Sequence, residues 1–242
     1  MKYLKKINTE SDYKTYRDGE GYLKPNVSLT IDTKNVFYNL NNNEHPYVDL
    51  GLPSGTLWAT MNVGASKPSD AGLYFQWGDT QGYTADQVGT GDGKKKFSSD
   101  WCDYKWGTDP DFSKYTSPGA KLELEDDAAH ANMGGNWHMP TDKQIQELIN
   151  TANTTSAWTT NEGVSGVTFT SKKDVSKSIF IPAAGMSSNG SVRYSGEDGY
   201  VGSSMLFNGI ARLGQYLHFG SGNTNLAIAN REVGLSVRGV IG

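Results

Sequence analysis

The chain has 242 residues, of which 36% are hydrophobic and 11% are aromatic. This aromatic content excludes an intrinsically disordered protein, because disordered chains lack the large apolar side chains that build a core. The net charge of −4 disfavours nucleic-acid binding, and the single cysteine, Cys102, excludes an intrachain disulfide.

Residues 1–45 differ from the rest of the chain, and we expect them to form an N-terminal docking segment. The stretch from Thr9 to Gly21 predicts a short helix, and Asn26–Asp32 with Val36–Tyr38 predicts a small β-hairpin. A hairpin of this size is not stable alone, so we expect it to dock on the main domain or on a partner. The first seven residues carry positive charge without the apolar segment of a signal peptide, and no stretch predicts a membrane span.

The main domain is expected at residues 46–242. Val48–Gly64 predicts a pair of strands interrupted by a turn, and Leu73–Gly78 predicts a compact aromatic strand. A polar, glycine-rich loop then runs from Asp79 to about Lys121, with Trp101 and Trp106 among its aromatic residues. A loop this long is packed by its own side chains or serves a function.

Two helices are predicted in the middle of the chain. The first runs from Glu125 to Met133, with Asp126 and Asp127 favouring its positive N-terminus and Gly134 ending it.

The second helix has the clearer signal. Thr141 as N-cap and Gln144 three residues later form a capping box. Ile145, Leu148 and Ile149 then form one apolar stripe.

Further short strands are predicted at Val167–Thr170, Ser178–Pro182, Leu213–Phe219 and Gly234–Val240. Two helices set among many short strands indicate an α+β fold.

Residues able to perform catalysis or bind a metal do not form a recognisable motif. The four histidines are His45, His130, His138 and His218. No pair has the spacing of a helical zinc site, and the chain has no CxxC motif. We interpret His138, just before a helix cap, as a hydrogen-bonded structural residue. Cys102 lacks an evident partner base, and the default interpretation is a small buried residue.

Acidic residues leave one catalytic alternative open. Asp109, Asp111 and the run Glu123–Asp127 include carboxylates in numbers sufficient for an acid/base pair, although clustered surface acids are common. Gly89–Gly93 lacks the alternating ligands of a calcium loop and is interpreted as a flexible loop.

Four segments form a distinctive series along the chain: Tyr47–Gly64, Gly134–Asp142 with the helix after it, Phe180–Gly185 and Gly234–Val240. These segments resemble the Fibrobacter-type major paralogous domain family of gut bacteria and their phages. They follow in the family's order and span roughly residues 47–240. This family is similar in fold to formylglycine-generating enzyme, so the resemblance implies a C-type-lectin-like domain with two helices around short antiparallel strands.

The resemblance also defines an enzymatic alternative. Formylglycine-generating enzymes use a cysteine pair near the C-terminus, and no cysteine follows Cys102 in this chain. Oxidoreductase activity would therefore depend on Cys102 alone, and we expect no catalysis, no cofactor and no metal. The calcium-lectin signatures Glu-Pro-Asn and Trp-Asn-Asp are missing, so sugar binding without a metal stays open.

Residues 200–242 resemble the variable region of proteins that retroelements diversify by mutating adenines in Asn codons. In this interpretation a rigid core displays changeable surface positions. The expected ligand-binding residues are Val201, Gly202, Met205, Leu206, Phe207, Gly209, Ile210, Arg212, Gln215, Tyr216, His218, Leu226, Ile228, Arg231, Glu232, Val233 and Leu235.

For each apolar member of this set, the alternative is a place in the core. Leu217 and Phe219, which alternate with His218, are expected to face inward. The remaining framework residues are assigned to structure; they are Ser203, Ser204, Gly220, Gly222, Asn223, Ser236 and Arg238.

Two functions are therefore expected from the sequence. The first is a non-catalytic, retroelement-diversified receptor-binding protein of a phage or prophage, contacting a cell-surface protein or glycan through residues 201–235. The second is a carbohydrate- or protein-binding module of fixed specificity, in which the loop around Trp101, Tyr104 and Trp106 stacks on a sugar.

The start of the chain indicates where such a protein acts. Tyr22–Ser28 resembles the start of structural proteins from phages and prophages of gut Bacteroidetes, so residues 1–45 are expected to anchor the chain to a larger assembly. We expect a virion or extracellular surface location after cytoplasmic synthesis, without nucleic-acid binding or membrane insertion. A homo-oligomer stays open.

Overall fold

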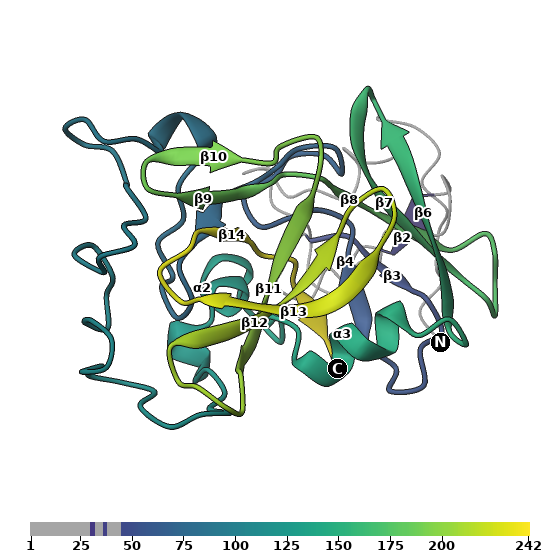
Figure 1. Cartoon of the computed structure of the whole chain (residues 1–242). Helices are drawn as coiled ribbons and strands as arrows, with labels where there is room; N and C mark the ends of the chain where they lie inside the picture. Colours follow the sequence, from purple (N-terminus) through teal and green to yellow (C-terminus); the bar gives the residue numbers. More distant parts are fainter. Residues whose placement is uncertain (1–29, 32–35, 38–44) are drawn as a thin grey trace, which may run out of the picture.

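A computed structural model describes residues 30–31, 36–37 and 45–242 (Figure 1). Over these residues the fold is α+β, with short strands in four sheets and two short α-helices. The predicted helix at Thr9–Gly21 and the Tyr22–Ser28 segment lie outside the described residues. Within the described ranges, no helix has the length and apolar character needed to cross a bilayer.

One five-stranded sheet joins the beginning and the end of the main domain. Its order is β1-β2-β3-β4-β15, with β1 at Thr30–Ile31, β2 at Val36–Phe37, β3 at Tyr47–Asp49, β4 at Leu57–Ala59 and β15 at Val240–Ile241. The predicted strand pair is confirmed as β3 and β4. The predicted hairpin is confirmed where it is described, and it continues the main sheet through the pairing of Phe37 with Tyr47.

A second five-stranded sheet carries most of the C-terminal region. Its order is β13-β12-β11-β14-β5, with β5 at Tyr74–Phe75, β11 at Gly199–Leu206, β12 at Leu213–Phe219, β13 at Thr224–Asn230 and β14 at Leu235–Ser236. The predicted Leu213–Phe219 strand is confirmed. The single strand predicted at Gly234–Val240 is wrong, because residues 237–239 cross between sheets and divide it into β14 and β15.

The other two sheets are smaller. One contains β6 (Thr154–Asn161), β7 (Val164–Ser171) and β8 (Ser178–Pro182), and the other is the hairpin of β9 (Met186–Ser188) and β10 (Ser191–Arg193). The strands predicted at Val167–Thr170 and Ser178–Pro182 are thus confirmed as β7 and β8.

The first predicted helix is only partly right. A 3-10 turn, η2 (Leu124–Asp126), precedes a shorter helix, α2 (Ala128–Met133), and Gly134 ends α2 with a positive φ of 69°. Asp127 lies between the two as the N-cap and accepts hydrogen bonds from the amides of His130 and Met139. The carboxylate of Asp127 is therefore buried at the junction between η2 and α2, where the 3-10 turn ends and α2 begins.

The second predicted helix, α3 (Asp142–Ile149), is confirmed with its capping box. The hydroxyl of Thr141 accepts from the Gln144 amide at 3.2 Å, and the Thr141 amide donates to the Gln144 side chain at 2.9 Å. Ile145 and Leu148 are buried. The helix α3 packs against β6, β11, β12 and β13, and Figure 1 shows it beside β13.

The core consists of two clusters. The first lies under α3 and the β6–β8 sheet and includes Trp58, Ile145, Leu148, Phe169, Ile181, Val201, Leu217 and Phe219. The second lies around α2 and the start of the long loop and includes Phe75, Trp77, Leu122, Met133, Trp137, Met139 and Leu206. Leu217 and Phe219 therefore face inward, as predicted.

A fully buried arginine joins three parts of the fold. Arg238 donates to the Asn62 side chain, to the Ala59 carbonyl and to the Phe180 carbonyl at 2.9, 3.0 and 3.2 Å. Two of these bonds reach the end of β4 and the residues just after it, and the third reaches β8, so Arg238 fixes the crossing from β14 to β15. The framework role predicted for Arg238 is confirmed, and Ser203, Ser204 and Ser236 are likewise buried.

Candidate ligand-binding surface

Several of the predicted ligand-binding residues are buried, which contradicts a place on the surface. They are Val201, Gly202, Leu206, Arg231 and Glu232. Val201 and Leu206 belong to the two core clusters. A side chain at Gly202 would come within 3.0 Å of Met139. Arg231 and Glu232 follow β13 and turn inward under the long loop.

The other predicted residues are exposed or half-buried. They are Met205, Phe207, Gly209, Ile210, Arg212, Gln215, Tyr216, His218, Leu226, Ile228, Val233 and Leu235. Val233 and Leu235 are half-buried and line a small pocket together with Gln215 and Arg231.

The residues of β12 and β13 divide between two faces of the sheet. The two strands pair in register from Leu213–Asn230 to Phe219–Thr224. Since side chains alternate along a strand, Tyr216 and His218 project from one face, while Gln215 and its partner Ile228 project from the other. The sequence-based set therefore does not form one continuous surface.

The face of Tyr216 and His218 gathers aromatic side chains from three segments. Tyr200 of β11 is itself buried, and its ring centroid lies 5.6 Å from Tyr216 and 5.1 Å from His218. Tyr194, which follows β10, lies 6.4 Å from Tyr200 and is 46% exposed. We call these four residues, together with Asp198, the tyrosine surface.

The carboxylate of Asp198 lies at the centre of this surface. Its Oδ1 is 3.3 Å from Nε2 of His218, whose Nδ1 lies 3.2 Å from the side-chain oxygen of Asn225. Burial, and then the negative charge of Asp198, raise the pKa of both Tyr200 and Tyr216. The two hydroxyls therefore keep their protons at neutral pH.

This arrangement suits the recognition of a polar ligand. Tyrosine rings offer apolar area at low entropy cost, and their hydroxyls form hydrogen bonds at the edge of the contact. The half-exposed carboxylate of Asp198 offers an acceptor beside them. Aromatic faces with a few convergent polar groups are typical of binding sites for sugars and peptides.

Glycine is required at two positions of the sheet that carries the tyrosine surface, one beside Asp198 and one beside the core residue Phe219. A Cβ on Gly220 would lie 2.5 Å from Oδ1 of Asp198, and a Cβ on Gly199 would lie 1.9 Å from the ring of Phe219. Both distances are far below a normal contact, so these positions require glycine for Asp198 and Phe219 to take their places.

A second exposed region is the turn between β11 and β12. Ile210 is 45% exposed, and Arg212 lies 3.9 Å from the carboxylate of Asp109 in the long loop. The carbonyl of Phe207 accepts a hydrogen bond from the Gly119 amide at 3.1 Å. The turn is therefore fixed to the long loop on one side and open to solvent on the other.

The long loop is packed by its own aromatic side chains. Trp101 lies edge-on to Tyr104 and Phe112, with ring centroids 5.4 and 5.3 Å away. The hydroxyl of Tyr104 donates to the Trp77 carbonyl. The guanidinium of Arg231 enters this group from the second sheet and lies 3.6 Å from the Phe112 centroid.

The indole of Trp106 also contacts groups of the chain itself. Its indole nitrogen donates to the Gly78 carbonyl at 3.0 Å, and the ammonium groups of Lys105 and Lys114 lie 4.4 and 5.4 Å from its ring centroid. The faces that a sugar would stack on are thus partly covered by the chain's own cations.

One carboxylate group has the spacing to hold a metal ion. Glu123, Glu125 and Asp126 bring their oxygens within 4.8 Å of one another. The ammonium of Lys114 lies among them, at 2.6, 2.9 and 2.6 Å, and these hydrogen bonds, with that to Asp126 foremost, raise its pKa. The lysine takes the position and the charge that a metal would supply.

The sequence offered two residues as candidates for a nucleophile and a base, Cys102 and His138. Cys102 is exposed, which contradicts its prediction as a buried residue. The two ring nitrogens of His138 lie 2.9 and 3.1 Å from the carbonyls of Met139 and Gly242, as expected for a structural histidine.

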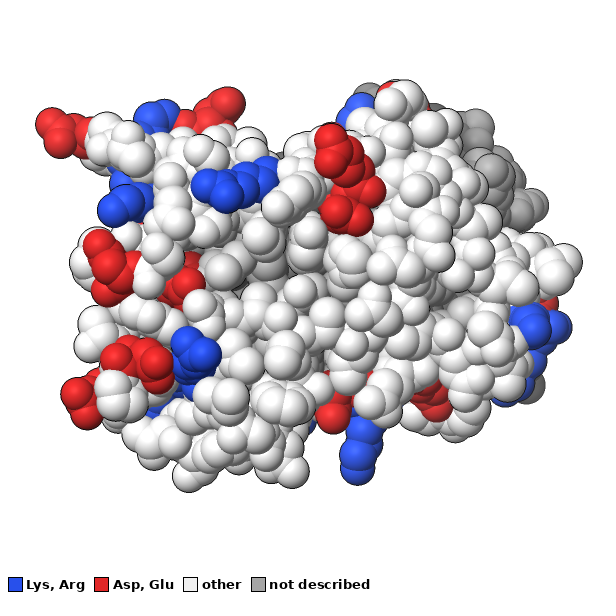
Figure 2. Space-filling view, viewed as in Figure 1, with Lys and Arg blue, Asp and Glu red and all other residues white. Residues whose placement is uncertain are grey.

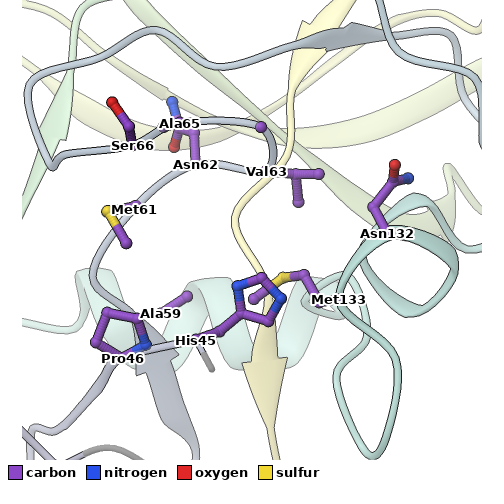
Figure 3. Close-up of a pocket in the computed structure, with 11 residues that line it drawn as sticks. His45, Pro46, Ala59, Met61, Asn62, Val63, Ala65, Ser66, Asn132 and Met133 are labelled. Carbon is purple, nitrogen blue, oxygen red and sulfur yellow. The ribbon is translucent and has the colours of Figure 1, made fainter. Parts of the chain in front are cut away.

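A pocket of about 300 Å³ lies between α2 and the segment that follows β4 (Figure 3). Its polar side chains are already bonded within the chain. Asn62 donates to the Ala71 carbonyl and accepts from Arg238, and Asn132 donates to the Ala128 carbonyl. The pocket therefore offers no set of converging catalytic groups.

The sequence did not predict Tyr194, Asp198 and Tyr200 as site residues. The pairing of Tyr200 with His218 across β11 and β12 could have been found if the register had been known. Tyr194 and Asp198 reach the surface through the turn after β10, for which the sequence carries no signal.

Comparison of the chain with family models, with curated proteins and with solved structures finds no match.

Proposed function

We propose that this chain is a non-catalytic ligand-binding protein that contacts a cell-surface protein or glycan through the tyrosine surface and the adjoining β11–β12 turn. The observation that carries the proposal is the convergence of three tyrosines, His218 and Asp198 from separate segments on one face of a rigid sheet. Binding proteins commonly place such aromatic anchors on a fixed scaffold.

A C-type-lectin-like domain is part of this proposal. It is supported by the α+β architecture, in which two short helices pack beside short antiparallel strands, and by the four family-like segments of the sequence. The segment 134–142 begins after α2 and leads into α3, and Val240 closes the first sheet beside Trp58.

Diversification by a retroelement is the second part. It is supported by apolar and aromatic side chains in the C-terminal region that reach the surface: Ile210 in the turn is exposed, and Phe207 in the turn and Tyr216 on the sheet are half-buried. Because backbone pairing holds β11 and β12 together, these side chains can change without altering the sheet. The DNA beside the gene tests this part: a near-copy of the last codons, with mismatches only at adenines, is expected next to a reverse transcriptase.

The aromatic loop is the less favoured surface. Trp101 packs on Tyr104 and Phe112, and Trp106 is covered by Lys105 and Lys114. A sugar would have to displace these contacts before it could stack.

Binding of the labelled full chain to a glycan array and to intact cells of gut Bacteroidetes tests the proposed surface. The double variant Tyr194→Ala/Tyr216→Ala is expected to lose at least about tenfold in apparent affinity. Trp101→Ala and the exposed turn variant Ser221→Ala are expected to bind as the parent does. Loss of binding in Trp101→Ala alone would assign the function to the aromatic loop instead.

A further inference from the structure

Among the described residues, the strand β13 forms an edge of the second sheet with no further strand paired to it. Its sequence from Thr224 to Asn230 contains no charged residue and no proline, and its pairing with β12 has no bulge. Charges, prolines and bulges are the devices by which proteins prevent edge strands from pairing with another chain. Figure 2 shows a surface without charged side chains over the middle of β13.

The unpaired backbone groups of this edge can be identified from the ladder. The Gly220 amide donates to the Asn223 carbonyl and the Arg231 amide to the Arg212 carbonyl, so odd-numbered residues of β13 point their backbone groups toward β12. The amides of residues 224, 226, 228 and 230 point outward, and none of them has a hydrogen-bond acceptor among the described residues.

The outward residues of β13 match a second copy of the same strand. In an antiparallel pair centred on Ala227, Leu226 lies opposite Ile228 of the second copy, and Ile228 lies opposite Leu226. The backbone N–H and C=O groups of Leu226 and Ile228 both point away from β12. In this register the two residues therefore form hydrogen-bonded pairs with the second copy. The central residue, Ala227, meets its own copy with the smallest side chain that has a Cβ.

Another long edge strand, β6 (Thr154–Asn161), also has no charged residue, proline or bulge, but it lacks the apolar pair. β6 is composed mostly of threonine and serine. It offers no apolar pair across a two-fold axis and serves as an internal comparison.

The geometry points to β13 as the interface of a symmetric dimer, in which two copies of the chain pair their β13 strands antiparallel about Ala227. The proposal gives a role to Ile228, which is 43% exposed and projects from the face opposite the tyrosine surface. An isologous contact of this kind closes on itself and leaves no further free β13 edge.

The pairing has a consequence for the proposed binding surface. Strands that pair edge to edge form one continuous sheet, and the two-fold axis of an antiparallel pair runs perpendicular to that sheet. Both copies of Tyr216 therefore lie on the same side of the dimer. A ligand displayed in many copies would be bound by both surfaces together.

Analytical ultracentrifugation of the full chain tests the dimer. Ala227→Lys and Ala227→Asp each place like charges opposite each other on the axis and are expected to be monomeric alone. An equal mixture of the two variants is expected to recover the dimer, which a misfolded variant would not do. Ala157→Lys on β6 is the matched control and keeps the parent's dimer. A parent chain that stays monomeric up to about 1 mM overturns the proposal, and so does a parent oligomer unaffected by both charges.

Cross-linking tests the register. In a Cys102→Ser background, Ala227→Cys places two thiols opposite each other across the axis, at a separation suited to a disulfide. Mild oxidation is expected to convert it to a covalent dimer, while Asn225→Cys, which lies opposite Ala229 of the second copy, remains a monomer. Equal cross-linking of the two variants contradicts the register centred on Ala227.

Discussion

The guanidinium carbon of Arg231 lies 3.6 Å from the centroid of the Phe112 ring. The contact joins the end of β13 to the long loop, and Trp77 and Tyr104 complete an aromatic shell around the charge. Nη1 of Arg231 donates to the Tyr115 carbonyl, whereas Nε and Nη2 of Arg231 have no hydrogen-bond partner among the described residues. Burial lowers the pKa of Arg231.

Arg231→Ala is expected to lower the free energy of unfolding by about 3 kcal/mol, because it leaves a cavity between sheet and loop. Arg231→Met fills much of that volume without a charge to desolvate, so it should lower the free energy of unfolding far less. Urea unfolding measures both, and the exposed Arg193→Ala should stay within about 0.5 kcal/mol of the parent. Equal losses in the alanine and methionine variants would show that the charge, and not the volume, stabilises the loop.

Glu232 gives the stability a measurable pH dependence. Burial raises the pKa of its carboxyl above the ordinary value of 4.5, so the native state keeps this proton at pH values where the unfolded chain has lost it. The contribution of this group is therefore fully present below pH 4.5 and is lost as the pH rises through the folded pKa. Glu232→Gln has no carboxyl to ionise, so the variant does not lose this stability as the pH rises.

The variant is accordingly expected to gain stability relative to the parent as the pH is raised from 4 toward neutrality. Denaturant unfolding at a series of pH values measures the difference. Glu197→Gln, at an exposed position, is the control and should follow the parent. A stability difference that does not change with pH would contradict the raised pKa of Glu232.

Gly199→Ala is expected to destabilise the second sheet by about 3 kcal/mol or more, because its Cβ would overlap the buried ring of Phe219. Gly222→Ala, in the β12–β13 turn, is the matched comparison, since nothing lies within 4 Å of its added Cβ. Thermal unfolding of the two variants should separate them clearly. A Gly199→Ala variant as stable as Gly222→Ala would mean that Phe219 can leave its position without loss.

Thr141→Ala removes the side-chain cap of α3 and should cost about 1 kcal/mol. Because α3 covers the first core cluster beneath β12 and β13, the loss should appear as a lower denaturant midpoint for the whole domain. Lys143→Ala, one residue into the same helix and exposed, should change the midpoint much less. The reverse order would show that the capping box contributes little to α3.

The elements predicted correctly are those whose signals are local. The capping box of Thr141 and Gln144 and the apolar pattern from Leu213 to Phe219 depend on neighbours in sequence. The start of the helix and both bounds of the strand were predicted correctly. The first helix was misjudged because Asp127 is held by the Met139 amide, a contact with a residue on the far side of a turn.

The binding residues were harder to predict for a different reason. Charge normally indicates exposure, so Arg231 and Glu232 were expected on the surface, but the long loop covers them after β13 ends. Alternation also shows which residues of one strand share a face, and Gln215 and Tyr216 could not both belong to the same surface. Which of the two faces is open depends on α3 and on Tyr200, and both are distant in sequence.

The position of the last strands sets the order in which the domain can be completed during synthesis. β14 lies between β11 and β5, and β15 pairs with β4. The early strands β4 and β5 therefore pair with strands that are synthesised much later. While the ribosome translates the region between them, the edges of β4 and β5 remain unpaired in the nascent chain. A chain cut short before Leu235 therefore lacks both the strand that joins β11 to β5 and the strand that pairs with β4.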